Sequence, residues 1–595
     1  MRFLSTLVAS TIGSLIALGL IFFIFIGFIF VAASAGEPAP QVRAGSVLHL
    51  DLSGPLYDAP PELPFASLSG DPVLTVRGVV RALEKAAADD RIEAVWLQPI
   101  GVGAGWASME EVRNALVAFK ASGKSLIASS GPDGFTEADY FLASAADEIY
   151  AVPEGSFELN GFFFAVQFYT EALAKLDIEP EVIRAGRFKA AVEPFTRTDL
   201  SEDNAEQLRS LIETQERVFF DAVSTSRDLP RETLNELTDS GAVYTAAEAE
   251  QAGLLDDLLY EDQVEDLLRE ATNTDADDSL RRVAVATYAR VSPSEAGLEV
   301  GNEGTIALVY AEGGIVTGES SRGGGFSGAT LGSETLNRQI RRLRDRDDID
   351  AIVLRIDSPG GSATASEAMW RELTLAAAEK PLIASMGELA ASGGYYIAAP
   401  ADTIVAEPTT ITGSIGVFAL LVSANGFFEN KLGITSDAVL TSPYADMFSG
   451  LRPLSDAEEA VIARGIDRTY ETFINRVAEG RGLSTDSVLA IAEGRVWSGS
   501  DAQAVRLVDV LGGIDVALDL AAERAGLAAD AYRVEVFPKE RPLFEQLEDA
   551  FQVKISERFQ SPAERTLMRS LRRLNQIAES HGSIQMRMEF DVEVR

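Results

Sequence analysis

An internal duplication constrains the fold of this chain more than any other feature of its sequence. The stretch RIEAVWLQPI and the helix-like MEEVRNALVAFK that follows it recur as DIDAIVLRIDSPGG and ASEAMWRELTLAAAEK. KSLIASSG, which begins at Lys124, recurs as KPLIASMG from Lys380, and AKLDIEP recurs as NKLGITS. The offset stays near 256 residues throughout, and chance similarity does not hold one register over so many segments. We therefore predict two tandem copies of one domain.

Each copy alternates short Val/Ile-rich runs with helical segments of about 12–18 residues, which predicts an α/β fold of interleaved strands and helices. A chain of 595 residues is also too long for one ordinary core. After about Asp530 the repeat ends and the sequence becomes charged, so we expect a solvated or packing appendage there. The predicted parts are a cytoplasmic N-terminus at 1–6, a transmembrane anchor at 7–35, a first repeat domain at 36–275, a linker at 276–303, a second repeat domain at 304–530 and a C-terminal extension at 531–595.

Several classes of chemistry are excluded by residues that the chain lacks. It contains no cysteine, which removes thiol nucleophiles and cysteine-based zinc sites. Its two histidines, His49 and His581, both lie far from the glycine-rich motifs, so a Ser-His-Asp triad is not expected. The formal net charge of −40 opposes binding to phosphate backbones, so nucleic acid is not an expected partner.

The N-terminal segment is long enough to span a membrane. No charged residue occurs between Arg2 and Glu37, and residues 7–33 are almost continuously apolar. This exceeds the roughly 20 residues that a spanning helix needs. A cleaved signal peptide is the alternative, because an ASA sequence ends the segment, but the apolar region of a signal peptide is usually about 7–15 residues. We predict a retained single-pass anchor, with the acidic bulk on the far side of the membrane from Arg2.

Two glycine-rich turns distinguish the second copy. The first, DSPGG at 357–361, joins a buried-strand pattern to a helix, and its backbone N–H groups could form an oxyanion hole. The second places Ser392 at a helix start, before Gly393 and Gly394. A serine N-cap is the simpler explanation. However, the first copy has about Glu137 at that position and lacks both glycine pairs. A structural cap has reason to be kept in both copies, whereas a nucleophile is needed in only one.

Lysine shows the reverse asymmetry. AGRFKAAVEPFTR in the first copy contains Lys189, and the second copy has Ala445 at that register. A lone lysine is normally a solvated surface charge, but the neighbours of Lys189 are apolar and suit burial. Burial lowers the pKa of a lysine, so that the neutral amine becomes available as a base. Each copy is thus predicted to supply half of one active site.

The segments GRFKAAVEPF, DSPGGS, AASGGYY and TGSIGVF resemble the signature stretches of the bacterial signal peptide peptidase A (protease IV) family in its long, two-copy form. The resemblance implies that Ser392 is the nucleophile, that Lys189 is the general base and that Ser414 holds the lysine amine. The implied oxyanion donors are the backbone N–H groups of Gly361 and Gly393. No metal or cofactor is implied.

The same resemblance implies two tandem crotonase-like domains, related to the caseinolytic protease subunits, and a homotetramer. It also implies that the substrates are signal peptides left in the bacterial inner membrane, with the catalytic part in the periplasm. Two alternatives remain at this stage. One is a crotonase-fold acyl-CoA enzyme, which coenzyme A binding would reveal. The other is a non-catalytic membrane scaffold, which covalent capture by a serine-directed phosphonate would exclude.

Overall fold

The computed structural model describes Gly13 and residues 42–60, 73–241, 243–275, 278–298, 301–321, 329–529, 531–539 and 585–587. Apart from Gly13, the anchor predicted at 7–35 lies outside these ranges. Within the ranges, no helix is both long enough and apolar enough to cross a membrane. His581 also lies outside them.

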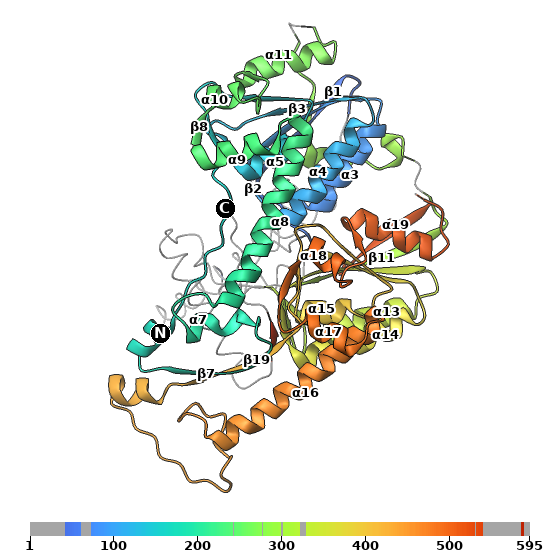
Figure 1. Ribbon diagram of the computed structural model, residues 1–595. Coiled ribbons are helices and arrows are strands. Elements are labelled where there is room, and N and C mark those ends of the chain that lie inside the picture. The colour runs from blue at the N-terminus through green and yellow to red at the C-terminus, as the bar shows by residue number, and fades with distance from the viewer. Residues whose placement is uncertain are drawn as a thin grey trace, which may run out of the picture.

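Two sheets with the same strand order form the body of the molecule (Figure 1). The first runs β10-β1-β2-β3-β5-β9, and the second runs β22-β11-β14-β16-β17-β21, with β18 and β20 added beside β16. All pairs in the first sheet are parallel. The first sheet comprises β1 (Ser46–Pro55), β2 (Ile92–Gly103), β3 (Ser125–Ser129), β5 (Glu148–Ala151), β9 (Asp257–Leu258) and β10 (Arg282–Ala284), and the second comprises β11 (Gly304–Glu312), β14 (Ala351–Ser358), β16 (Leu382–Ala391), β17 (Thr403–Ala406), β18 (Ile411–Gly413), β20 (Val496–Ser498), β21 (Val510–Leu511) and β22 (Tyr532–Phe537). The predicted α/β class and internal repeat are therefore confirmed.

Helices cover both faces of each sheet. Because side chains alternate along a strand, Val47 of β1 packs in one apolar cluster with α11 and Leu48 packs in another with α3 and α4. The second sheet has α19 on one face and α13 to α16 on the other. The helices of the first copy are α3 (Val76–Ala88), α4 (Trp106–Lys120), α5 (Glu137–Ala143), α6 (Thr170–Lys175), α7 (Glu193–Thr196), α8 (Glu202–Arg227), α9 (Arg231–Ser240), α10 (Ala246–Gln251), α11 (Glu261–Ala271) and α12 (Val285–Tyr288). Those of the second copy are α13 (Ser333–Arg344), α14 (Ala363–Ala377), α15 (Gly393–Ala398), α16 (Asp456–Arg481), α17 (Thr485–Ile491), α18 (Gly499–Ala504) and α19 (Ile514–Arg524).

The sheets extend past two of the predicted boundaries. β10 lies within the predicted linker 276–303 and pairs with β1, and β22 lies within the predicted extension 531–595 and pairs with β11. In both copies the last strand returns to pair with the first. Local composition did not reveal this pairing, because it joins segments that are more than 200 residues apart.

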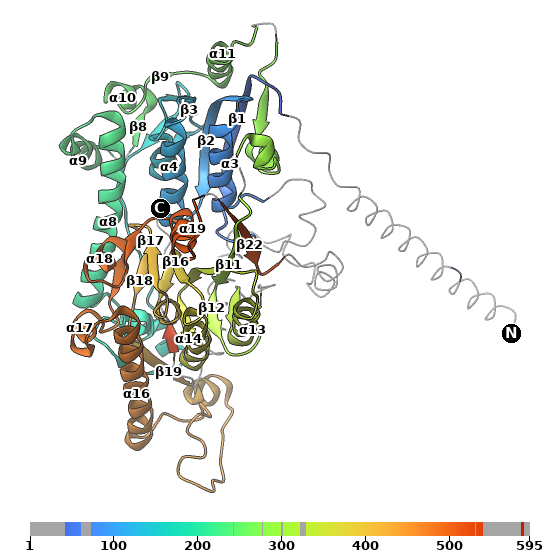
Figure 2. The ribbon, with the colours of Figure 1, turned by 90° about the vertical axis from the view of Figure 1, so that its right-hand side faces the viewer.

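A third sheet contains strands from both copies. Its order is β13-β12-β15-β23-β19-β7, in which β7 (Glu179–Ala185) comes from the first copy and pairs antiparallel with β19 (Val417–Ser423) over seven residue pairs. Helix α8 also runs alongside both copies (Figures 1 and 2). The remaining strands here are β12 (Gly314–Val316), β13 (Thr330–Gly332), β15 (Gly360–Ser362) and β23 (Gln585–Arg587), and a small separate sheet holds β4 (Gly134–Phe135), β6 (Ser156–Glu158) and β8 (Val243–Thr245).

A buried ion pair joins the two copies at their centre. Arg355 of β14 donates to Asp58 at 2.7 Å and to Glu111, both of which belong to the first copy. The Arg355 side chain has no exposed surface. Removing one member of such a group would leave a buried charge without its counterion, so these contacts hold the copies in one relative position.

Candidate active site

Ser392 sits at the junction of β16 and α15 in a strained backbone conformation. Its φ is +56° and its ψ is −113°, which is a sparsely populated region for any residue with a side chain. The backbone N–H of Ser392 donates to the carbonyl of Gly413 at 2.8 Å. The side chain makes no capping hydrogen bond to the helix. The simpler explanation of Ser392 as an N-cap is therefore wrong, and its hydroxyl is available for another role.

Lys189 reaches this hydroxyl from the first copy. It lies four residues beyond the end of β7, so the pairing of β7 with β19 carries it to the second copy. The backbone N–H of Phe188 donates to the carbonyl of Glu493 at 2.9 Å. Gln207 of α8 donates to the carbonyl of Phe188 at 3.2 Å and accepts from the N–H of Val496 at 3.1 Å. These bonds fix the Lys189 loop against the second copy.

Gly494 allows the two segments to approach closely. Its φ is +79°, and a methyl group at its Cα would lie 2.7 Å from both the backbone nitrogen and the Cβ of Lys189. Only glycine fits there without a shift of the lysine backbone.

The Lys189 amine contacts three oxygens. Nζ lies 2.8 Å from Oγ of Ser392, 3.0 Å from Oγ of Ser414 and 3.1 Å from the carbonyl oxygen of Ser414. A neutral amine has two N–H bonds and one lone pair. It can therefore donate twice to Ser414 and accept the hydroxyl proton of Ser392.

Burial makes the neutral form accessible. Lys189 is 1% exposed, and this burial lowers its pKa from 10.5 to about 7. No carboxylate contributes to the shift. An amine with this pKa is half neutral near pH 7, which suits a general base.

The glycine turn of β15 lies beside Ser392. Gly360 has a φ of +93°, and a methyl group there would lie 2.6 Å from the backbone nitrogen of Gly393. Gly361 follows on β15, where it pairs with Ile315 of β12. The structure thus brings Lys189 of the first copy into contact with Ser392 and Ser414 of the second, and it places Gly360, the residue before Gly361, against Gly393. Two glycine-bearing segments next to a hydroxyl can supply backbone N–H donors to a developing oxyanion.

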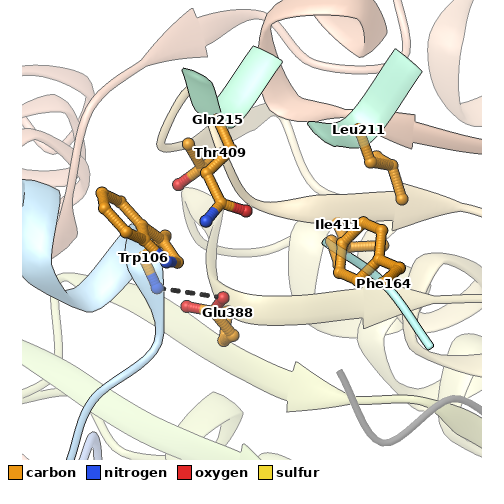
Figure 3. Close-up of a pocket in the computed structure, with 7 residues that line it drawn as sticks. All are labelled: Trp106, Phe164, Leu211, Gln215, Glu388, Thr409 and Ile411. Carbon is orange, nitrogen blue, oxygen red and sulfur yellow. Dashed lines mark hydrogen bonds between the residues drawn. The ribbon is translucent and has the colours of Figure 1, made fainter. Parts of the chain in front are cut away.

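A pocket opens a few residues along the same strands (Figure 3). Glu388 of β16 accepts hydrogen bonds from the backbone N–H groups of Trp106 at 3.2 Å and Ala107 at 3.0 Å. Burial raises the pKa of the Glu388 carboxyl to about 7. The pocket is built by both copies and is lined by Trp106, Phe164, Leu211, Gln215, Glu388, Thr409 and Ile411.

Other candidate groups lie elsewhere. Nε2 of His49 lies 2.7 Å from Oε1 of Gln98, and the His49 ring packs against Trp96 with 4.8 Å between centroids, so His49 is a structural residue of the first sheet. In the described part of the chain, no group of three His, Cys, Asp or Glu side chains is placed to hold a metal ion.

The sequence did not point to the residues that position Lys189. Gln207 and Gly494 both act through backbone contacts, which have no motif of their own. The one available signal for Gly494 was its place in GRVWSGS, since this glycine precedes a strand-like run.

A serine hydroxyl, a buried amine and paired glycine turns define a candidate serine hydrolase site. Residues 118–275 and 374–528 match the model of peptidase family S49, one match in each copy. The chain belongs to peptidase family S49 and is a serine protease.

Curated relatives show the same relationship. "Serine protease SPPA, chloroplastic" of Arabidopsis thaliana is 34% identical over 82% of this chain and 71% of its own length. "Protease 4" of Salmonella typhi is 34% identical over 85% of this chain and 83% of its own. "Putative signal peptide peptidase SppA" of Enterococcus faecium is 31% identical over 42% of this chain and 71% of its own length. A solved ClpP1 mutant of Listeria monocytogenes covers 36% of this chain at 16% identity with a TM-score of 0.23. That score carries no argument about the fold, so the crotonase-like assignment stays a prediction.

Proposed function

We propose that this protease cleaves peptides with a Ser392/Lys189 dyad. The observation that carries the proposal is the 2.8 Å contact between Nζ of Lys189 and Oγ of Ser392 at a fully buried position. The three contacts described for the amine are with hydroxyl and carbonyl oxygens, and none is with a carboxylate that would hold the amine in its charged form.

The reaction follows from this geometry. The neutral amine of Lys189 takes the hydroxyl proton of Ser392 as Oγ attacks the peptide carbonyl carbon. The backbone N–H groups of Gly361 and Gly393 stabilise the oxyanion. Lys189 then returns its proton to the leaving amine, which breaks the C–N bond. Water hydrolyses the acyl-enzyme by the same route, so that the base regains its neutral state. Ser414 holds the amine through both steps.

We further propose that the substrates are signal peptides left in the bacterial inner membrane after secretion. The apolar segment at 7–35 would anchor the enzyme there as a single pass, with residues 36–595 in the periplasm. The name of the Enterococcus faecium relative supports this substrate class.

A homotetramer is also proposed. Residues 424–452 form an arm that extends away from the body at the foot of Figure 1. An apolar surface of this kind on a soluble domain marks an interaction site, and a second copy of the chain is the proposed occupant. The exposed apolar side chains on this arm are Phe428, Leu432, Ile434, Val439, Leu440, Tyr444, Phe448 and Leu451.

The test uses the full-length protein in detergent with a synthetic signal peptide. Mass spectrometry should show internal fragments with the wild type and an intact peptide with Ser392→Ala. Equal fragmentation by both proteins would refute the assigned nucleophile. Protease treatment of spheroplasts tests the location, because a periplasmic domain should be degraded and a protected domain would contradict the topology.

A further inference from the structure

The segment β23 (Gln585–Arg587) lies between β15 and β19 in the mixed third sheet. It pairs antiparallel with β15, so that Gly360 faces Arg587, Gly361 faces Met586 and Ser362 faces Gln585. On its other side, Gln585 pairs antiparallel with Phe418 of β19. β15 and β19 are otherwise separated in this sheet. They form a slot that one extended strand fills.

This slot is next to the nucleophile. The carbonyl oxygen of Met586 lies so close to Gly360 that a methyl group there would be 2.2 Å from it and 2.6 Å from the nitrogen of Gly393. A methyl group on Gly393 would lie 3.1 Å from the same oxygen. The carbonyl group of Met586 therefore lies against Gly360 and Gly393, the two glycines beside Ser392.

The side chain of Met586 is equally well accommodated. Met586 has no exposed surface and belongs to the main apolar cluster of the second copy. The sequence IQMRMEFDVEV at 584–594 alternates apolar and polar residues, which is typical of a strand with one buried face. Met586 is on the apolar side of that alternation.

We propose that the strand Gln585–Arg587 is a built-in competitor for the peptide-binding slot, with Met586 as its anchor. Main-chain pairing gives affinity without demanding a particular sequence, so a peptide substrate would bind as the same antiparallel strand and must first displace the tail. A tethered ligand competes at an effective concentration on the order of millimolar. The inference rests on the proposed function, because it requires that Ser392 be the reactive group.

The rate of labelling by a small serine-directed phosphonate tests the proposal. Met586→Asp puts a carboxylate where an apolar side chain is buried, which should release the strand and raise the labelling rate of Ser392 about tenfold or more. Met568→Asp is the matched control, because it makes the same change in the C-terminal sequence outside β23, and it should label at the wild-type rate. Equal rates for wild type and Met586→Asp would overturn the competitor. No labelling of any of the three would instead refute the proposed nucleophile.

Two further measurements guard against a variant that misfolds or a tail that is lost. A chain ending at residue 539 should also label faster than wild type, and a synthetic peptide of residues 582–590 should slow that labelling while having little effect on the full chain. Failure of the peptide to slow labelling of the truncated chain would contradict the assigned slot.

The intact masses of wild type and Ser392→Ala are measured before labelling. Loss of the residues after Met586 from wild type, but not from Ser392→Ala, would support occupancy, because cleavage there requires that the strand lie beside Ser392.

Discussion

The starts of helices α5 and α15 occupy equivalent places in the two copies but have different uses. The structure makes Thr136, one residue before the expected Glu137, the first-copy equivalent of Ser392. Thr136 has a φ of −89°, and its side chain accepts a hydrogen bond from the N–H of Asp139 at 3.2 Å. In the second copy Ser392 has a φ of +56° and caps nothing. One hydroxyl stabilises a helix, whereas the other faces a buried amine at the cost of backbone strain.

The strands that lead into helices α4 and α14 also differ between the two copies. β2 continues as a strand to Gly103, whereas β14 ends at Ser358 and the chain turns at Gly360. The later loops of the two copies also differ. In the first copy the loop carries Lys189 to Ser392, whereas in the second copy residues 424–452 form the apolar arm. In the proposed site each copy supplies one half, so activity would require that both copies be docked together.

The largest expected effect is on the hydroxyl itself. Ser392→Ala should abolish peptide hydrolysis, since removing a catalytic serine cost roughly 10⁶-fold in one serine protease. The equivalent change in the first copy, Thr136→Ala, should leave kcat/KM within a few-fold of wild type. Rates are measured on a short peptide, with circular dichroism to check folding. Loss of activity in Thr136→Ala alone would reverse the roles of the two copies.

Lys189→Arg should be as damaging to peptide hydrolysis as Lys189→Ala, because a general base must lose its proton and arginine keeps its proton in proteins. A substantially active Lys189→Arg would exclude Lys189 as the general base.

Lys189→Met should be inactive but more stable at neutral pH by a few kcal/mol, at roughly 1.4 kcal/mol per unit of pKa shift. The pKa of Lys189 is about 7 in the folded state, and its ordinary value is 10.5. Between these two pH values the unfolded chain therefore binds one more proton than the folded chain. The stabilising effect of Met should therefore shrink as pH rises from about 7 to 10.5. Thermal unfolding of wild type and Lys189→Met at several pH values checks the sign of this change.

Gly494→Ala should lower kcat/KM on the order of 100-fold, because the methyl group pushes on the Lys189 backbone and small displacements of a reacting group are costly. Gly482→Ala is the matched control. Gly482 also has a positive φ, of +60°, but nothing lies within 4 Å of the added methyl group. Equal activity of the two variants would show that the approach of Gly494 to Lys189 is not important.

The pH dependence of kcat/KM should follow the neutral fraction of Lys189. Because burial places its pKa at about 7, activity should rise with pH, level off above that value and fall about tenfold for each unit well below it. A profile that stays flat from pH 5 to 8 would mean that Lys189 does not titrate in the rate-limiting step.

The smallest effect concerns the helix caps. Thr136→Ala should lower the free energy of unfolding by about 1 kcal/mol through loss of a cap. Ser392→Ala should show no such loss, because its hydroxyl makes no capping bond. Chemical denaturation of both variants measures this difference, and a matching loss in Ser392→Ala would mean that Ser392 is a structural cap after all.

The sequence predicted the repeat, the α/β class and the residues that meet at the site, because the duplication exposed asymmetries at Ser392 and Lys189 that a single copy would have hidden. It did not predict how Lys189 crosses between copies, since the pairing of β7 with β19 depends on tertiary packing. The tail was interpreted as a charged appendage, although the alternation at 584–594 was visible and indicated a strand. Its place between β15 and β19 could not be read from local pattern, because strand pairing is a long-range property.

The most direct test of the split site is the location of a covalent adduct. Wild-type protein is treated with a serine-directed phosphonate and digested, and the modified peptide is sequenced by mass spectrometry, with Lys189→Arg treated in parallel. We expect one adduct, on Ser392, that is nearly absent from Lys189→Arg. An adduct on another serine, or equal labelling of Ser392 in both proteins, would contradict it.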